Sequence, residues 1–503
     1  QIKAIFDKWE LDCEVIGEVT QSGDMELFWE EEKIAHIPIA PITENAPVLQ
    51  LPTKEPAYIA QARAKNPLES LQHHTAAHSL TDITRILLGS IDICDKEWIY
   101  SQYDSSVQTN TLIAAGQGDG SVVRIKENGA ALGAAIHAPV RYCYLNPKEG
   151  AKIAVARAGR KCATRGIKPL AISDCLNFGN PNNPEVMWQF KESCEGIKEA
   201  CEVLQTPVVS GNVSLYNQTD STDIYPTPTI VSVGLASDPQ GVIDSAFTKE
   251  GSKIALLGEI GEDFGGSVLE KLAQMGAFGG HLGGEIVPSG DSPQIDLAQE
   301  KRLWGLLLEG IGSRLILSAK EVGEGGLGIA LAKMSILSRL GCAAQISLPK
   351  REMLFSQTQS CVVVETSDFA QLQELAKLHS FPCTLLGEVL GGDSINIQVD
   401  SSGRDSVLGS HSADFRDLEA TADLKSSSAP KSLKNYESTT ATPRILEKDN
   451  QAECKKSAQT QKVDSSTASS NQQADNPQAI HLSIQEAGEI FFQSFASSIA
   501  RGL

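Results

Sequence analysis

The sequence lacks the long apolar runs and paired cysteines that mark membrane proteins and disulfide-stabilised proteins. None of its 503 residues lies in a run approaching the roughly 20 apolar residues that a membrane-spanning helix needs. The residues after Gln1 do not show the basic and then apolar order of a secretory signal. The 11 cysteines form no Cys-x-x-Cys pair, which argues against a disulfide framework or a zinc ribbon. These absences predict a cytoplasmic protein with reduced thiols and no membrane partner.

Clustered basic residues are also missing, and the formal net charge is −20. Nucleic-acid surfaces hold phosphates with grouped Lys and Arg, so we expect no nucleic-acid partner. No Gly-x-x-x-x-Gly-Lys-Ser/Thr string occurs, which excludes a P-loop. A nucleotide pocket is still compatible with an acidic chain, because Mg²⁺ and backbone amides supply local positive charge.

The stretch from residue 169 to 216 predicts a strand–helix–strand unit. Leu170–Ser173 is a short apolar run typical of a strand, and Pro207–Ser210 is a second one. Between them, the apolar residues after Pro184 recur every three or four positions, which favours an amphipathic helix. If the two strands are parallel neighbours, the polar stretches that follow them reach the same edge of the sheet. We therefore expect these stretches, residues 174–181 and 210–214, to be loops that face one pocket.

The residues in these stretches suit phosphate chemistry. Asp174 and Asn212 offer the oxygen ligands that Mg²⁺ accepts. Gly211 has no Cβ, so its backbone N–H can approach an anion closely, and the Ser214 hydroxyl can hold a polar group of a substrate. An alternative is that both stretches are ordinary turns, since Asn, Gly, Pro and Asp are common in turns.

Whole strings in this region resemble a known family. They are residues 174–181 (Asp-Cys-Leu-Asn-Phe-Gly-Asn-Pro) and 206–217 (Thr-Pro-Val-Val-Ser-Gly-Asn-Val-Ser-Leu-Tyr-Asn). Shorter matches occur at residues 102–104, 107–111, 141–147, 225–228 and 318–327. With these strings the chain resembles the phosphoribosylformylglycinamidine synthases, in their synthetase subunit of the small, multi-subunit type. The resemblance implies an α/β (α+β) fold with a duplicated architecture like that of aminoimidazole ribonucleotide synthase, each repeat having an N-terminal and a C-terminal domain.

An internal repeat supports duplication. Residues 13–19 (Cys-Glu-Val-Ile-Gly-Glu-Val), followed by Gly23-Asp24, have a counterpart in residues 383–389 (Cys-Thr-Leu-Leu-Gly-Glu-Val), followed by Gly392-Asp393. Each copy predicts the end of a helix, a strand, a turn and another strand. We expect the first repeat to be incomplete, lacking its N-terminal portion. The domains we expect are a remnant of the first repeat at 1–40, a linker with a solvated insertion at 41–79, an N-terminal-type domain at 80–237, a C-terminal-type domain at 242–400, a disordered insertion at 417–480 and a terminal helix at 482–503.

The resemblance also implies a reaction and roles for residues. ATP would phosphorylate the amide oxygen of formylglycinamide ribonucleotide, and ammonia would displace the phosphate to give formylglycinamidine ribonucleotide in purine biosynthesis. By position, Asp174 and Gly211 would contact ATP, Asn212 would bind Mg²⁺, and Ser214 would contact the ribonucleotide. The catalytic residues would lie in the missing N-terminal half, so the isolated chain should be nearly inactive. The implied partners are a separate glutaminase subunit, which supplies ammonia, and a small bridging subunit.

Other interpretations stay open. The chain could be another synthetase or kinase of the same superfamily, although the long string at 174–181 argues against this, or a non-catalytic nucleotide-binding scaffold. Residues 323–328 match the dinucleotide glycine pattern, but the resemblance assigns these glycines to the start of a helix. His74 and His78 have the i, i+4 spacing of metal ligands on a helix, and we expect a solvated insertion there instead.

Overall fold

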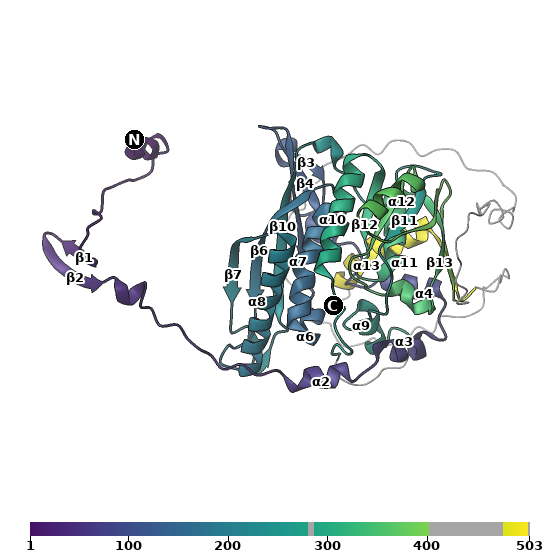
Figure 1. Ribbon diagram of the computed structural model, residues 1–503, viewed down its shortest axis with the longest axis horizontal. Coiled ribbons are helices and arrows are strands. Elements are labelled where there is room, and N and C mark those ends of the chain that lie inside the picture. Colours follow the sequence, from purple (N-terminus) through teal and green to yellow (C-terminus); the bar gives the residue numbers. More distant parts are fainter. Residues whose placement is uncertain (280–285, 402–475, 501–503) are drawn as a thin grey trace, which may run out of the picture.

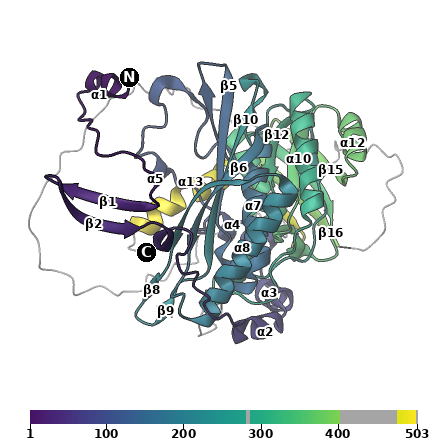
Figure 2. The ribbon, with the colours of Figure 1, turned by 60° about the vertical axis from the view of Figure 1, so that its left-hand side comes forward.

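Two mixed sheets with their covering helices form the body of the protein, and an N-terminal arm extends away from it (Figures 1 and 2). The computed structural model describes residues 1–279, 286–401 and 476–500. The mixture of helices and sheets confirms the predicted α/β class. Among the described residues, no helix is both long enough and apolar enough to cross a bilayer.

The first sheet has six strands in the order β3-β4-β5-β10-β6-β7. Strands β6 and β7 are parallel, and the other neighbours are antiparallel. Apolar side chains on one face are buried beneath two long helices, whereas Leu132 and Ile136 on the other face are 39% and 57% exposed. The strands are β3 (Thr111–Ile113), β4 (Ser121–Ile125), β5 (Ala130–His137), β6 (Lys168–Asn177), β7 (Val208–Ser214) and β10 (Thr227–Ala236), and the helices are α7 (Pro147–Ala163) and α8 (Pro184–Leu204).

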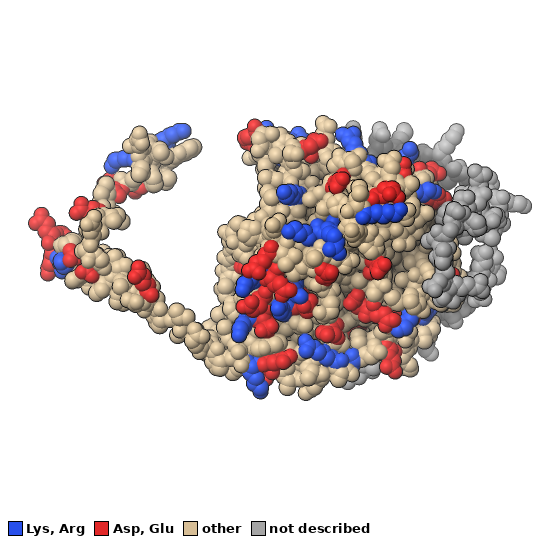
Figure 3. All heavy atoms as spheres, in the orientation of Figure 1, with Lys and Arg blue, Asp and Glu red and all other residues tan. Residues whose placement is uncertain are grey.

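Both long helices begin where the sequence provides a cap. The side chain of Asn146 accepts a hydrogen bond from the backbone N–H of Glu149 at 3.2 Å, and that of Asn183 accepts one from Glu185 at 3.0 Å. In each case proline occupies the first turn, where its missing N–H would have had no helical partner. The outer surface of this region carries acidic and basic side chains side by side (Figure 3).

The second sheet has seven strands in the order β12-β14-β11-β15-β13-β16-β17. One hydrophobic core joins a face of this sheet to α7 and α8, and a second core fills the opposite face. Helices α10 and α12 belong to the first core, and α4, α9, α11 and α13 to the second. The strands are β11 (Lys253–Leu257), β12 (Ile316–Glu321), β13 (Gly341–Ser347), β14 (Val362–Thr366), β15 (Cys383–Leu390), β16 (Ser394–Asp400) and β17 (Ala479–Ser483), and the helices are α4 (Leu80–Leu88), α9 (Val268–Gln274), α10 (Leu297–Gly312), α11 (Gly326–Ser338), α12 (Phe369–Leu378) and α13 (Ile484–Ala500).

Short elements complete the body. They are α5 (Glu97–Tyr100), η2 (Val107–Thr109), α6 (Val140–Leu145), β8 (Gln218–Thr219), β9 (Thr222–Asp223), η3 (Pro239–Gly241) and η4 (Arg351–Phe355). The disordered insertion expected at 417–480 lies mostly outside the described residues. Its last residues differ from the expectation, because β17 begins at Ala479 and pairs with β16. The predicted terminal helix is present as α13.

The sequence had led us to expect a solvated insertion in the segment 57–79, and this expectation is wrong. It forms α2 (Ala57–Arg63) and α3 (Pro67–Thr75), and Leu71 and Thr75 are buried. His78 contacts the backbone oxygen of Phe278 through Nε2 at 3.0 Å. The apolar side of α3 thus packs on the body of the protein, which explains its ordered structure.

The N-terminal arm contains α1 (Ile2–Lys8), the hairpin β1 (Asp24–Trp29) and β2 (Glu32–Pro38), and η1 (Ala40–Ile42). The strand predicted at residues 13–19 is not formed, and Val15, Ile16 and Val19 are almost fully exposed. Its counterpart β15 is a strand because it pairs with β11 and β13. Among the described residues, no strand lies beside residues 13–19. The same sequence pattern therefore leaves the backbone of these residues without strand partners.

Candidate functional site

The strands that carry the four predicted site residues are neighbours. Strands β6 and β7 pair in parallel, with Asp174 opposite Gly211 and Asn177 opposite Ser214. This confirms the parallel pairing expected from the sequence. The polar stretches begin inside the strands rather than in loops, because β6 continues to Asn177 and β7 to Ser214. The sequence placed the strand ends too early.

Asp174 lies on the helix-covered face of the sheet. Its neighbours at alternate positions, Ile172 and Leu176, are buried in the core shared with α8. Burial raises the pKa of Asp174. Burial and the nearby Asp174 carboxylate also raise the pKa of the Cys194 thiol in α8 to about 11. A Cβ on Gly211 would lie 2.0 Å from Asp174 Oδ1, so the carboxylate occupies the space that the glycine leaves free.

Asn212 and Ser214 lie on the opposite, open face. Asn212 Nδ2 is 3.9 Å from the sulfur of Cys175, which is its partner on β6. Ser173 and Ser210 on the same face are joined by a hydrogen bond of 2.8 Å between their hydroxyl groups. Since side chains alternate along a strand, a single pocket on one face cannot hold all four predicted residues, and that expectation is wrong. Strand β7 is the edge of the sheet, so the two faces meet along its free side.

The side chains around Asn212 do not by themselves fit a Mg²⁺ ion. They offer amide oxygens and a thiol, whereas Mg²⁺ prefers carboxylate and phosphate oxygens in octahedral geometry. Asp174, the carboxylate opposite Gly211, is directed to the other face. Across residues 1–279, 286–401 and 476–500, no group of three or more His, Cys, Asp or Glu side chains is arranged to hold a metal.

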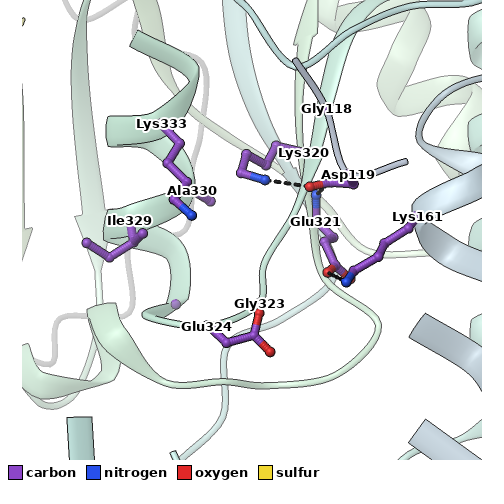
Figure 4. Close-up of a pocket in the computed structure, with 11 residues that line it drawn as sticks. Gly118, Asp119, Lys161, Lys320, Glu321, Gly323, Glu324, Ile329, Ala330 and Lys333 are labelled. Carbon is purple, nitrogen blue, oxygen red and sulfur yellow. Dashed lines mark hydrogen bonds and ion pairs between the residues drawn. The ribbon is translucent and has the colours of Figure 1, made fainter. Parts of the chain in front are cut away.

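A cavity of about 190 Å³ lies between the two sheets, where β12 leads into α11 (Figure 4). Lys320 Nζ lies 2.5 Å from Asp119 Oδ1, and Glu321 contributes a second carboxylate. Burial opposes ionisation of Asp119, yet Lys320 and Arg165 hold its pKa at about 2. Burial and Lys320 lower the pKa of Lys333 to about 7.

The glycine-rich stretch 323–328 forms the beginning of α11 beside this cavity. Gly325 and Gly326 adopt left-handed backbone conformations, with φ of 84° and 72°. A Cβ on Gly326 would come within 2.5 Å of the Phe355 backbone, so glycine is required by packing there. These contacts agree with the helix-start interpretation of the glycines.

Arg157 connects the two domains behind this cavity. Its guanidinium, fully buried, lies 2.7 Å from Glu321 and 2.8 Å from Glu324. It also contacts His137 Nε2 at 3.0 Å. The Glu324 side chain is 38% exposed, and Arg157 holds the pKa of its carboxylate well below the usual value. Burial and Arg157 lower the pKa of His137 well below its usual value.

A second cavity, of about 410 Å³, adjoins the first on the side of α6 and α9. Arg141 lies there, 3.1 Å from Glu270. Burial raises the pKa of Glu270 although Arg141 and Ser289 act against it. Sequence reasoning missed the charged residues of both cavities. The available signal was the Gly118-Asp119-Gly120 stretch, in which an acidic residue stands between two glycines.

Comparisons with known proteins agree with this two-domain arrangement. The family model described as AIR synthase related protein, N-terminal domain, matches residues 117–236, and the model for the C-terminal domain of the same family matches residues 249–400. The first match ends at the last residue of β10, and the second ends at the last residue of β16. The implied architecture of AIR-synthase-like domains is thereby confirmed.

Curated relatives carry one name. The phosphoribosylformylglycinamidine synthase subunit PurL of Wolinella succinogenes is 51% identical over 403 residues, which is 80% of this chain and 52% of that protein. The subunit of the same name from Helicobacter hepaticus is 50% identical over 410 residues, covering 80% of this chain and 52% of the relative. The chain thus spans about half the length of these relatives.

Among solved structures, Thermotoga maritima PurL complexed with FGAR matches with a TM-score of 0.51 and 18% identity. The match covers 66% of this chain and 54% of that chain. At this identity the similarity supports the fold.

Proposed function

The chain belongs to the AIR synthase related family, in the group of the PurL synthetase subunits, and from this membership we propose that it works as part of an ATP-dependent phosphoribosylformylglycinamidine synthase. The reaction would join ammonia, derived from glutamine, to formylglycinamide ribonucleotide in purine biosynthesis in the cytoplasm. The observation that supports this most is the 51% identity to the Wolinella succinogenes subunit over 403 residues. ATP would transfer a phosphoryl group to the amide oxygen, and ammonia would then displace phosphate.

We place the nucleotide contacts of this chain at the free edge of β7. Asp174 can accept a hydrogen bond from an amino or hydroxyl group, and Gly211 leaves its backbone accessible beside it. On the other face, Ser214 can donate to a phosphate or carbonyl oxygen of the ribonucleotide. Asp174 and Gly211 lie on one face of the sheet, and Asn212 and Ser214 on the other. A ligand lying along the edge strand could contact residues on both faces. Fixed donors of this kind are what phosphoryl transfer requires of a protein.

Asn212 has a restricted role in this proposal. It can supply one amide oxygen to a Mg²⁺ ion only if phosphate oxygens or carboxylates from outside this chain complete the shell. Catalytic residues, a glutaminase subunit and a small bridging subunit would likewise come from outside the chain. The chain itself binds and orients the substrates.

A chimera tests the proposal. In the Wolinella succinogenes relative, the half that this chain matches would be replaced by this chain. With ammonium chloride as nitrogen source, we expect the purified chimera to form formylglycinamidine ribonucleotide and ADP, and its gene to restore growth of a purine auxotroph lacking this enzyme. Ser214→Ala should raise the KM for the ribonucleotide.

The decisive control is folding of the chimera. A folded chimera that binds ATP but makes no product would favour the scaffold interpretation. A chimera that phosphorylates a different acceptor would favour another synthetase or kinase of the superfamily. Either result would overturn the proposed reaction.

A further inference from the structure

The side chain of Asn217 holds Ser214 in place at the end of β7. Asn217 Nδ2 donates to the Ser214 backbone oxygen at 2.9 Å and lies 3.1 Å from Ser214 Oγ. The Ser214 hydroxyl in turn donates to Asn217 Oδ1 at 3.3 Å. The amide group therefore contacts both the backbone and the hydroxyl of the serine.

Asn217 also ties the ends of the two parallel strands together. Its Nδ2 donates to the backbone oxygen of Phe178 at 3.0 Å, directly after β6. Its backbone N–H donates to the same oxygen at 3.1 Å, and the Phe178 N–H donates to the Ser214 oxygen at 3.0 Å. One side chain thus fixes the position of Ser214 relative to β6, the strand that carries Asp174.

The backbone before Asn217 adopts an uncommon conformation to allow this. Tyr216 has a φ of 61°, in the left-handed region that L-residues with side chains rarely adopt. Its N–H donates to the Gly179 oxygen at 2.8 Å, which holds the residue in that conformation. Such conformations cost energy and persist where the surrounding contacts enforce them. Here the left-handed conformation of Tyr216 reverses the direction of the chain, so that the Asn217 side chain reaches Ser214.

We propose that Asn217 is a positioning residue that orients the Ser214 hydroxyl toward the phosphorylated ribonucleotide substrate, and this inference rests on the proposed function. The two hydrogens of Asn217 Nδ2 are directed to the backbone oxygens of Ser214 and Phe178, and the Ser214 hydroxyl donates to Asn217 Oδ1 at 3.3 Å. This long hydrogen bond holds Oγ in place, and the hydroxyl hydrogen can turn from it to an anionic oxygen of the substrate. Asn217 acts through Ser214, so binding of the ribonucleotide depends on Asn217. The proposed ATP contact, Asp174, lies on the opposite face of the sheet and does not depend on Asn217.

The test is a double-mutant cycle in the chimera described above. We expect Asn217→Asp, which removes both amide donors at nearly constant size, to raise the KM for formylglycinamide ribonucleotide about three- to tenfold. The KM for ATP should stay within about twofold, because Asp174 is not contacted. The variant Ser214→Ala/Asn217→Asp should bind the substrate no more weakly than Ser214→Ala alone.

Asn183→Ala is the matched control, because this asparagine lies in the neighbouring loop and caps α8 without contacting Ser214. It should lower the melting temperature and leave both KM values unchanged. Additive effects in the cycle, or equal increases in both KM values, would overturn the inference while leaving the proposed reaction intact. An inactive wild-type chimera would instead overturn the proposed reaction, and the inference with it.

Discussion

At position 211 a side chain would collide with the carboxylate of Asp174 as it now lies. The hydrogen that replaces a side chain there faces the carboxylate of Asp174, and a Cβ would lie 2.0 Å from its Oδ1. The backbone conformation is ordinary for a strand, so the requirement comes from the neighbouring carboxylate. A residue that looks like turn glycine in the sequence is in fact a close-packing glycine inside a sheet.

Gly211→Ala should therefore displace Asp174. We expect the free energy of unfolding to fall by about 1–3 kcal/mol, as for other overpacked sites, because either the carboxylate or β7 must move. Urea denaturation of this chain measures the change. Gly241→Ala is the control, since no atom lies within 4 Å of its added Cβ. Equal stability of the two variants would show that Asp174 moves freely and is not held against Gly211.

Glu300 is a buried residue whose carboxylate accepts several hydrogen bonds. Its carboxylate accepts hydrogen bonds of 2.8 Å from Arg160 Nε and 2.8 Å from Arg160 Nη2. Trp304 Nε1 and Ser360 Oγ add hydrogen bonds of 2.9 and 2.6 Å. Arg160 and Glu300 are both fully buried. Without the Glu300 charge, Arg160 keeps one more distant carboxylate, since Glu321 Oε2 lies 3.6 Å from Arg160 Nη1. This contact does not replace the two short hydrogen bonds to Glu300 in a medium of low polarity.

Glu300→Gln should lower the free energy of unfolding by about 3–5 kcal/mol, measured by urea denaturation at neutral pH. Glu374→Gln is the matched control, because Glu374 pairs with Lys377 on the surface and its side chain is 71% exposed. The control should change stability by less than about 1 kcal/mol. A loss at Glu300 as small as that of the control would mean that Glu321 or water compensates the charge of Arg160.

At the scale of elements, periodicity predicted the helices well. The helix expected after Pro184 is α8, and the terminal helix expected at 482–503 is α13. The parallel pair β6–β7 was also predictable, because a helix between two apolar runs leaves few other arrangements. The strand ends were not. Asn, Gly and Ser normally indicate turns, but here they continue β6 and β7 because the ladder between the strands satisfies their backbone groups.

Pairing between distant segments was the other feature that the sequence could not supply. The pattern at residues 13–19 is that of a strand, yet strand formation depends on neighbours that the arm does not have among the described residues. Conversely, β17 lies in a stretch whose upstream composition suggested disorder, and it is a strand because β16 offers it an edge. The charged residues of the cavities come from separate elements, among them the turn before β4, α6, α7, β12 and α11, and no single local motif links them.

The pairing of β16 with β17 leads to a prediction about the segment between them. Gln398 lies opposite Ala479, and the N–H of Val399 donates to the Gln478 oxygen at 2.8 Å, so the two strands come together like the arms of a hairpin. Replacing residues 402–475 by a short Asn-Gly-containing turn should keep the fold. A shorter connection also lowers the entropy cost of closing the loop, by about 0.6 kcal/mol for each halving of its length.

Thermal unfolding and circular dichroism of the shortened protein would test this, with a second variant in which a Gly/Ser linker of the original length replaces 402–475. Both should unfold cooperatively, and the short version at the same or a higher temperature. A large loss of stability in both variants would mean that the replaced residues make contacts that the body requires.

At the scale of the whole molecule, an ionic network around the buried guanidinium of Arg157 links the two domains. Arg157 on α7 joins Glu321 and Glu324 of the second domain, and His137 at the end of β5 lies against the same guanidinium. The contact requires a neutral imidazole, because a protonated ring would place a second positive charge beside Arg157. Burial and Arg157 together lower the pKa of His137 well below 6.5. The domain interface should therefore be sensitive to protonation.

This sensitivity has a definite direction. In the unfolded chain His137 binds a proton near its usual pKa of 6.5, whereas in the folded protein it stays neutral. Below about pH 6.5 the unfolded state therefore holds more protons, and the free energy of unfolding should fall by up to about 1.4 kcal/mol per pH unit. Urea denaturation of this chain between about pH 6.5 and 5.5 measures this slope. His137→Gln, which keeps an acceptor for Arg157 and cannot be protonated, should remove most of this slope. The pKa of Glu324 lies well below its usual value and that of Asp119 is about 2, so both groups lose their contribution to stability only at lower pH. If the variant and the wild type share one slope, His137 is protonated in the folded protein and the two domains are held together without a neutral imidazole at their junction.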